Sequence, residues 1–286
     1  MMHAASTLKR VLLEKAVKGT FFFRSRDYFN ESQIWSDLAR RNPVAAAIAA
    51  DGESWEQKRS REAVNFLNSR LIEGVILDIG CGYGRIAKYL LQRRVFEGYI
   101  GLDGSSEMLR LFYERYQNSN LENRTPLLLI LSGIDNIPLK SDSVSNAVVS
   151  AVFLHNPKKV TSLSIGEIYR VLKPGGKVFV MSSFFNKWSL RGLRDGLYLS
   201  FLILLGQGLR NGPVRYFSRK EVNNLFRGFR GVGIYEIGFE VVPKSIFLSK
   251  WNISFGLYRI NRLFERICPA KWKGYFAVHF DIVACK

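Results

Sequence analysis

The sequence predicts an α/β fold with a doubly wound, mostly parallel sheet of seven strands. From about residue 74 onward, short apolar segments rich in β-branched residues alternate with amphipathic helical segments. This alternation is typical of parallel strands joined by right-handed helical crossovers. Near the end, the segments 232–242 and 275–286 alternate apolar and polar residues with period two, as half-buried strands do. They complete the sheet, with a helical insertion before the last strand.

The other elements follow one another in a regular order. Five strands are expected before the final two, at 74–80, 98–104, 126–133, 146–154 and 177–184. Helices are expected at 85–95, 105–117, 160–173 and 255–267. Ser105 is a suitable N-cap for the second of these helices, and Pro-Gly-Gly stops the third.

The domain organisation predicted from these patterns is one main domain with additions. Residues 1–70 read as an N-terminal helical cap, because apolar residues recur there at spacings of three and four. Residues 71–286 form the α/β domain. Lid-like additions are expected at about 184–218 and 243–275, where helical segments exceed the length of a simple connection.

The composition favours a globular protein with a basic surface. Of the 286 residues, 47% are hydrophobic, which excludes global disorder. The net charge of +18 suits a nucleic acid, an anionic membrane surface or an anionic substrate, and equally a merely solvated basic surface. The three cysteines lack paired spacing, so we expect a reducing, cytoplasmic compartment.

No targeting or membrane-spanning segment is expected. The first residues are basic and helix-prone without a long apolar core. The longest apolar run, 197–206, is about half the length that spans a bilayer. It predicts a buried helix, and an interfacial segment is the alternative.

The stretch Leu77–Ala87, LDIGCGYGRIA, places three glycines at alternate positions between a strand and a helix. Such a turn brings backbone N–H groups and a helix N-terminus beside a ligand. A phosphate-binding P-loop requires Gly-Lys-Ser/Thr, which is absent here. The dinucleotide fingerprint requires a third glycine or alanine where this chain has Arg85, a poor substitute at a helix–strand contact.

The remaining pattern, Asp78-x-Gly80-x-Gly82-x-Gly84, resembles the class I S-adenosylmethionine-dependent methyltransferases of the small-molecule, type 11-like branch. The resemblance continues in order through GYIGLDGSSEML, IDNIPLKSDSVSNAVVSAVFLHN and EIYRVLKPGGKVFV, and covers about residues 75–180. It implies a Rossmann-like fold, S-adenosyl-L-methionine as the cofactor and methyl transfer as the activity.

The resemblance also implies a set of cofactor-binding residues. Asp103 would accept the ribose hydroxyl protons, and Gly80 and Gly82 would let the backbone approach the amino acid portion. Asp78 would hold either the loop amides or, through water, the ligand ammonium. Met108 would lie against the adenine, although an ordinary core methionine explains it as well. The full expected set is Asp78, Gly80, Gly82, Tyr83, Gly84, Asp103, Gly104, Ser105, Met108, Gly133, Ile134 and Ala151.

Two positions depart from the family pattern. Relatives often have an acidic residue for the adenine amino group where this chain has Gly133, so adenine recognition would rest on the backbone around Ile134 or on Asp135. The aspartate expected before the fourth strand is Asn146 here, a position we interpret as structural.

His155 is the candidate catalytic residue. It follows the fourth strand, at the carboxyl edge where doubly wound sheets bind ligands, and it could take a proton from an acceptor oxygen. A capping or packing histidine is the alternative reading. His279 and Cys81 are interpreted as structural, and no metal-ligand motif is present in the sequence.

The acceptor is expected to be a small molecule, hydrophobic or lipid-linked and anionic, because both additions combine apolar and basic residues. Peripheral contact with an anionic membrane follows as a hypothesis. One alternative is a tRNA or RNA methyltransferase, favoured by the charge and by the resemblance of the His-containing end of the fourth strand to relatives that act on tRNA. The other is a non-catalytic interaction protein with this fold. The intact Asp78, Gly80, Gly82, Gly84 and Asp103 argue against the last of these.

Overall fold

The computed structural model describes the main domain almost completely. The described residues are 22–23, 36–37, 40, 63–93, 95–119, 125–204, 214–239 and 254–286. Most of the predicted cap 1–70, with its aromatic residues Tyr28, Phe29 and Trp35, lies outside them, as do parts of both predicted lid additions.

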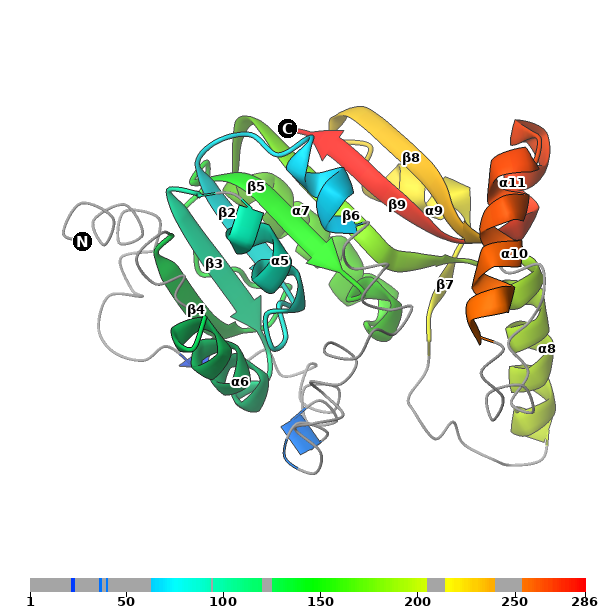
Figure 1. Cartoon of the computed structure of the whole chain (residues 1–286), viewed down its shortest axis with the longest axis horizontal. Coiled ribbons are helices and arrows are strands. Elements are labelled where there is room, and N and C mark those ends of the chain that lie inside the picture. The colour runs from blue at the N-terminus through cyan, green and yellow to red at the C-terminus, as the bar shows by residue number, and fades with distance from the viewer. Residues whose placement is uncertain are drawn as a thin grey trace.

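The described residues form a nine-stranded sheet at the centre of the molecule (Figure 1), in the order β1-β4-β3-β2-β5-β6-β9-β8, with β7 paired to β6. The strands are β1 (Phe22–Phe23), β2 (Val75–Ile79), β3 (Gly98–Asp103), β4 (Leu127–Ser132), β5 (Val144–Ser150), β6 (Leu172–Asn186), β7 (Tyr216–Phe217), β8 (Arg230–Phe239) and β9 (Ala277–Cys285). Because β1 and β7 have two residues each, the seven longer strands confirm the predicted sheet. Within the described residues, β9 is antiparallel to both of its neighbours, β6 and β8, and the other strand pairs are parallel.

Helices cover both faces of the sheet. They are α5 (Arg85–Arg93), α6 (Ser106–Gln117), α7 (Lys158–Val171), α8 (Leu190–Leu204), α9 (Arg219–Leu225), α10 (Ser254–Ile267) and α11 (Ala270–Phe276), with a 3₁₀ turn η3 (Phe153–His155). Apart from Met108, the buried side chains of α5 and α6 join one apolar cluster, and the buried apolar side chains of α7 and α9 join the other. The helices α8, α10 and α11 lie together at the β8–β9 end (Figure 1).

Each central strand contributes to both clusters. Leu77 and Val149 pack on the α7 side, whereas Ile76 and Val148 pack on the α5 side. All four side chains are fully buried. This two-sided burial explains why the strands are continuous apolar runs in the sequence.

Three predicted boundaries are wrong. The fourth long strand ends at Ser150 rather than 154, because Ala151 has a φ of 58° and leads into η3. Helix α7 ends at Val171 rather than directly before Pro174, because Leu172 already pairs with Val144 in the sheet. The last strand begins at 277 because the preceding segment forms α11.

The apolar run 197–206 is helical as predicted, through residue 204, but the expected burial is wrong where its side chains are described. Leu197 is 75% exposed. Among the helices of the described ranges, none is both long and apolar enough to cross a membrane.

Asn146 fastens the segment before β2 to the centre of the sheet. Its Oδ1 accepts a hydrogen bond from the Ile72 amide at 3.1 Å, and its Nδ2 donates to the Ile72 carbonyl at 2.8 Å. The side chain is fully buried. The structural interpretation of this position therefore agrees with its contacts, because an amide makes both bonds and a carboxylate makes one.

We expect Asn146→Asp to lower the free energy of unfolding by about 2 kcal/mol, because it removes a donor and buries a carboxylate beside a carbonyl. Denaturant unfolding measures this change. The control is Asn136→Asp at an exposed loop position, for which little change is expected. Equal stability of the two variants would contradict the proposed role of Asn146.

Candidate functional site

The glycine loop after β2 turns back onto the end of β3. Gly80, Gly82 and Gly84 have φ values of 65°, 53° and 79°, a left-handed backbone that favours glycine. The Gly80 amide donates to the Leu102 carbonyl at 2.7 Å, and the Gly82 amide donates to Asp103 Oδ2 at 2.8 Å. The loop is therefore held by the strand beside it.

The three glycines differ in what a side chain would meet. A Cβ on Gly80 would lie 2.4 Å from Val152 Cγ2, and one on Gly84 would lie 2.4 Å from Phe112 Cδ2. Among the described residues, a Cβ on Gly82 would meet no atom within 4 Å. Gly80 and Gly84 are therefore required for packing, whereas the described part of the chain leaves the space in front of Gly82 open.

Asp103 ends β3 and joins two loops through its carboxylate. Oδ2 accepts the Gly82 amide, and Oδ1 accepts the Ser105 amide at 2.9 Å. Burial raises the pKa of Asp103, and the amides of Ser105, Gly82 and Gly104 oppose that rise. The residue is nevertheless partly exposed, and each carboxylate oxygen has a second lone pair available for a ligand hydroxyl.

Helix α6 begins beside this carboxylate. The Ser105 side chain caps the helix by accepting the Met108 amide at 3.2 Å, as predicted, and it also bonds the Ser36 hydroxyl at 2.8 Å. Met108 is buried and packs with Tyr83 and Leu111, apart from both main clusters. Met108 and Tyr83 thus form a small apolar surface between the glycine loop and α6.

Asp78 is buried beneath the loop. Its Oδ2 accepts a hydrogen bond from the Tyr99 hydroxyl at 2.7 Å. Burial raises the pKa of Asp78 to about 7, although the Tyr99 bond and the charge of Arg85 lower it. One predicted alternative is therefore corrected, because the backbone of Leu102 and the carboxylate of Asp103 hold the loop amides.

The ends of β4 and β5 lie at the same edge, because both strands are parallel to β2 and β3. Gly133 and Ile134 are buried just after β4, and the Ile134 side chain belongs to the α7-side cluster. The Ile134 side chain is thus core, and only its backbone is left for a ligand. Ala151 follows β5, and its amide donates to the Met181 carbonyl at 2.9 Å.

His155 ends η3 and is partly buried, and this burial lowers its pKa. Its amide donates to the carbonyl of Val152, the residue against which Gly80 packs. The turn that carries His155 is thus in contact with the glycine loop. The structure brings the predicted residues of four strand ends to one edge of the sheet.

A second polar cluster at this edge was missed by the sequence analysis. The buried His279 places Nε2 at 3.4 Å from Ser182 Oγ and at 3.5 Å from Asp281 Oδ1. Asp281 Oδ1 also accepts the Ser182 amide at 2.8 Å. The signal was the period-two spacing of His279 and Asp281, which puts both on one face of β9. Ser182 has a φ of 49°, and its strained backbone could not be read from the sequence.

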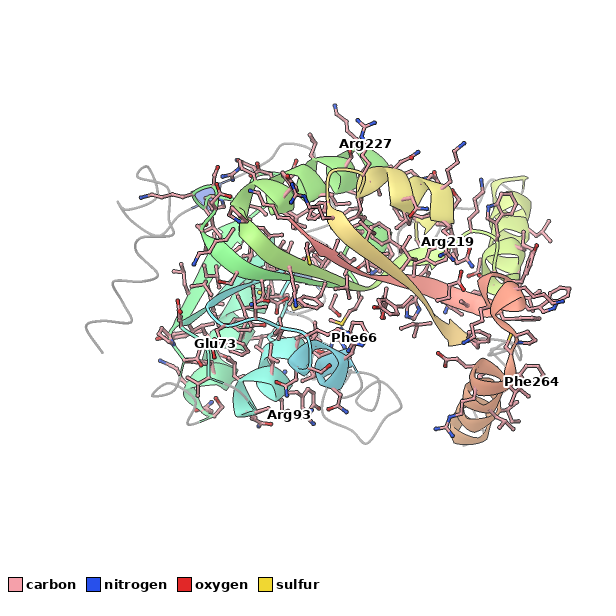
Figure 2. All side chains as sticks on the ribbon, turned by 90° about the horizontal axis from the view of Figure 1, so that it is seen from above. Phe66, Glu73, Arg93, Arg219, Arg227 and Phe264 are labelled. Atoms are coloured by element: carbon pink, nitrogen blue, oxygen red, sulfur yellow. The ribbon has the colours of Figure 1, made fainter. Side chains whose placement is uncertain are left out.

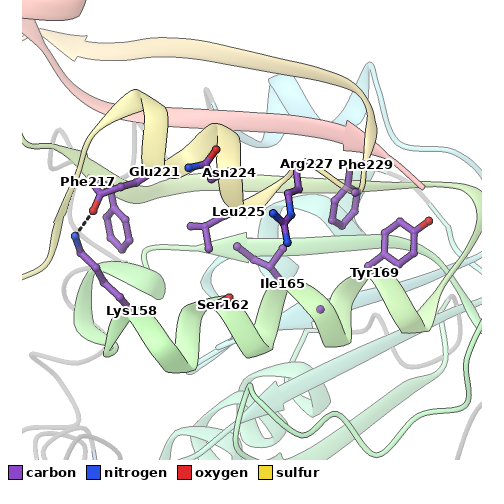
Figure 3. A pocket seen from close by; sticks show the side chains of 12 residues that line it. Lys158, Ser162, Ile165, Tyr169, Phe217, Glu221, Asn224, Leu225, Arg227 and Phe229 are labelled. Carbon is purple, nitrogen blue, oxygen red and sulfur yellow. Dashed lines mark hydrogen bonds and ion pairs between the residues drawn. The ribbon is translucent and has the colours of Figure 1, made fainter.

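A groove of about 530 Å³ lies between α7 and α9, on the sheet face opposite α5 (Figure 3). An ion pair between Lys158 and Glu221 closes one end, and Tyr169 and Phe229 pack edge-to-face at the other. None of the predicted site residues lines this groove. The glycine loop and this groove are separate features.

Comparison with known proteins finds relatives in sequence and in structure. Residues 77–180 match the methyltransferase domain family. An uncharacterized chloroplastic methyltransferase of Arabidopsis thaliana is 36% identical over 147 residues, which cover 51% of this chain and 38% of that protein. The ubiquinone/menaquinone biosynthesis C-methyltransferase of Wigglesworthia glossinidia brevipalpis is 30% identical over 117 residues, covering 41% of this chain and 45% of that protein. The chain therefore spans less than half the length of these relatives.

A solved structure shares the fold over most of the chain. Magnesium protoporphyrin IX methyltransferase from Synechocystis has a TM-score of 0.55 and 17% identity, and the match covers 91% of this chain and 97% of that one. The sheet order and the glycine loop thus define the class I methyltransferase fold. Residues 77–180 match the methyltransferase domain family, and the relatives named above are methyltransferases.

S-adenosylmethionine is the cofactor of this family, and the residues at the sheet edge fit it. The open space at Gly82 would admit the amino acid portion close to the backbone. Asp103 has acceptor capacity left for two ribose hydroxyls, and Met108 with Tyr83 offers an apolar surface beside them. Within the described ranges, no group of three His, Cys, Asp or Glu side chains could hold a metal ion.

The pKa of Asp78 makes the stability of the protein depend on pH. Because the folded-state pKa of about 7 exceeds the ordinary aspartate pKa of 3.8, the folded protein binds this proton more tightly than the unfolded chain does. The stabilisation is complete below about pH 4 and is lost as the pH rises toward about 7. We therefore expect Asp78→Asn to flatten the dependence of the melting temperature on pH in this window, as measured by scanning calorimetry. An unchanged slope would contradict the assignment.

Proposed function

We propose that this protein transfers the methyl group of S-adenosylmethionine to a hydrophobic small-molecule acceptor. The observation that carries the proposal is the open space at Gly82 beside the partly exposed carboxylate of Asp103. A backbone that approaches a ligand closely and an acceptor of two hydroxyl protons are what the cofactor's amino acid and ribose portions require.

Residues at different strand ends would each bind a different part of the cofactor. Asp103 would hold the ribose, Gly80 and Gly82 the amino acid portion, and the Ile134 backbone the adenine edge. Asp78 would attract the cofactor's ammonium, because a positive charge nearby favours the ionised carboxyl. Ionisation of Asp78 would then accompany cofactor binding, since its pKa without that charge is about 7.

The proposed acceptor class rests on two supports. The relatives include a methyltransferase of ubiquinone/menaquinone biosynthesis, and a structural neighbour acts on magnesium protoporphyrin IX. In this chain, the helices beyond the carboxyl end of β6 expose apolar and basic side chains. An apolar acceptor, lipid-linked or carrying an anionic group, would match both supports.

His155 would act on the acceptor rather than on the cofactor. When bound, S-adenosylmethionine supplies an activated methyl group with a good, neutral leaving group, so alignment is the main task left to the protein. Because burial lowers the pKa of His155, its imidazole is neutral near pH 7 and can accept a proton from an acceptor oxygen.

The proposed activity is tested by incubating the full chain with methyl-labelled cofactor and separate fractions of lipids, RNA and small metabolites. We expect label in the lipid or hydrophobic metabolite fraction. Label found only in RNA would overturn the acceptor class. Cofactor binding without label in any fraction would instead indicate a non-catalytic interaction protein.

Gly82→Ala and Gly84→Ala form a matched pair, because both place a Cβ on a left-handed backbone. Gly84→Ala should destabilise the fold, since its Cβ meets Phe112. Gly82→Ala should cost only backbone strain of about 1 to 2 kcal/mol and should remove the thermal shift that S-adenosylmethionine causes. A full thermal shift in Gly82→Ala would contradict the proposed cradle.

His155→Ala should reduce turnover by about 100-fold or more, the usual contribution of a general base, and leave the cofactor-induced thermal shift intact. Steady-state kinetics of labelled methyl transfer measures the loss. His279→Gln is the companion variant at the same sheet edge. If His279→Gln lowers turnover and His155→Ala does not, the base has been assigned to the wrong histidine.

A further inference from the structure

The exposed large apolar side chains of this protein gather on three helices. Ten of the fifteen among the described residues lie in α8, α10, α11 or directly before α8. We call this set the apolar end: Trp188, Leu190, Leu193, Leu197, Ile260, Leu263, Phe264, Ile267, Trp272 and Tyr275. A soluble monomer rarely exposes so many large apolar residues together, so this end needs a partner.

The apolar end is organised in helical stripes. Ile260, Leu263, Phe264 and Ile267 recur at spacings of three and four on α10, which is the pattern of a helix face that is normally buried. Here Ile267 is 64% exposed. Figure 2 shows Phe264 on the side of α10 that points away from the sheet.

Helix α10 lies against β8. Cys268, directly after α10, is buried in a small cluster with Phe239 and Ala277. The helix is thus attached to the protein although the side chains of its stripe are exposed. Helix α8 repeats the arrangement, because Leu190, Leu193 and Leu197 also recur at helical spacing and are exposed.

The charges around the stripes are mostly positive. The segments 187–197 and 260–276 contain seven Lys and Arg residues but only two acids, Asp195 and Glu265. Asp195 already accepts hydrogen bonds from Arg194 and Tyr216. Lys187 Nζ lies 5.2 Å from the centre of the Trp188 ring, so a cation stands beside an exposed aromatic group.

We propose that the apolar end binds the surface of an anionic phospholipid bilayer. Aromatic and aliphatic side chains would enter the interface, and the Lys and Arg side chains would meet the headgroups, as in interfacial amphipathic helices. A second copy of this chain suits the surface less well. Two such ends would bring positive charges together in a protein whose net charge is +18.

The apolar end lies next to the candidate site. Helix α8 follows closely after β6, whose carboxyl end is at the same edge as the glycine loop because β6 is parallel to β5. Asn186, the last residue of β6, donates to the carbonyls of Gly274 and Ala277 at 2.6 and 3.0 Å. Docking would thus hold the site near the membrane. A site near the membrane could reach a lipophilic acceptor there, and this benefit rests on the proposed function. The proposal of lipid binding itself does not rest on it.

Flotation of the full chain with phospholipid vesicles tests the proposal. The vesicles are phosphatidylcholine with or without phosphatidylglycerol. We expect binding to the anionic vesicles. The Leu263→Glu/Ile267→Glu double variant should bind at least tenfold more weakly, because it replaces two apolar side chains that would be buried in the bilayer with charged ones. The matched control is Leu163→Glu on α7, where Leu163 is 50% exposed compared with 58% for Leu263.

The cofactor-induced thermal shift is measured on every variant, so that loss of folding or of the proposed methyltransferase site is seen separately from loss of lipid binding. The proposal is wrong if the unmodified protein does not float with anionic vesicles, or if Leu163→Glu weakens binding as much as the double variant. It is also wrong if the protein does not bind vesicles and instead forms a dimer that is lost in the double variant.

Discussion

The carboxylate of Asp103 is the interaction on which the candidate site depends. One oxygen accepts the amide of Gly82 and the other accepts the amide of Ser105, so one side chain fixes both the glycine loop and the start of α6. Charge-assisted bonds from backbone amides are strong and directional. The open space at Gly82, the Met108–Tyr83 surface and the free lone pairs of Asp103 are placed together by this one group.

The candidate cofactor site and the proposed lipid-binding helices lie at different parts of the sheet. The parallel strands β2 to β5 bring their carboxyl ends to one edge, where ligands bind in folds of this type. The antiparallel β9 lies between β6 and β8, and α8, α10 and α11 lie together at the end of these strands (Figure 1). The cofactor residues thus stand on well-packed strands, whereas the proposed lipid-binding residues stand on helices that project from the last strands.

The sequence was sufficient for the sheet and for the glycine loop, because buried parallel strands and left-handed glycines leave local signals. It could not distinguish the roles of the three glycines. Gly84 is needed for Phe112, a residue twenty-eight positions away, and this contact exists only in three dimensions. The cluster of Ser182, His279 and Asp281 could not be predicted for the same reason, since it joins two strands about 100 residues apart.

The solvent exposure of an apolar helix face could not be predicted from the sequence either. An apolar stripe has the same periodicity whether it faces a core or a membrane, so the run near Leu197 was interpreted as buried. The structure leaves Leu197 open to solvent. The boundary at Ala151 depends on a left-handed residue that no sequence rule requires to be left-handed.

Calorimetric titration of the full chain with S-adenosylmethionine tests the central claim most directly. We expect saturable binding at one site per chain, and loss of that binding in Asp103→Ala, because this change frees the Gly82 and Ser105 amides and removes the ribose acceptor. The folded state of Asp103→Ala is checked by circular dichroism. Absence of heat with the unmodified protein, or undiminished binding in a folded Asp103→Ala, would contradict the assignment of this edge as the cofactor site.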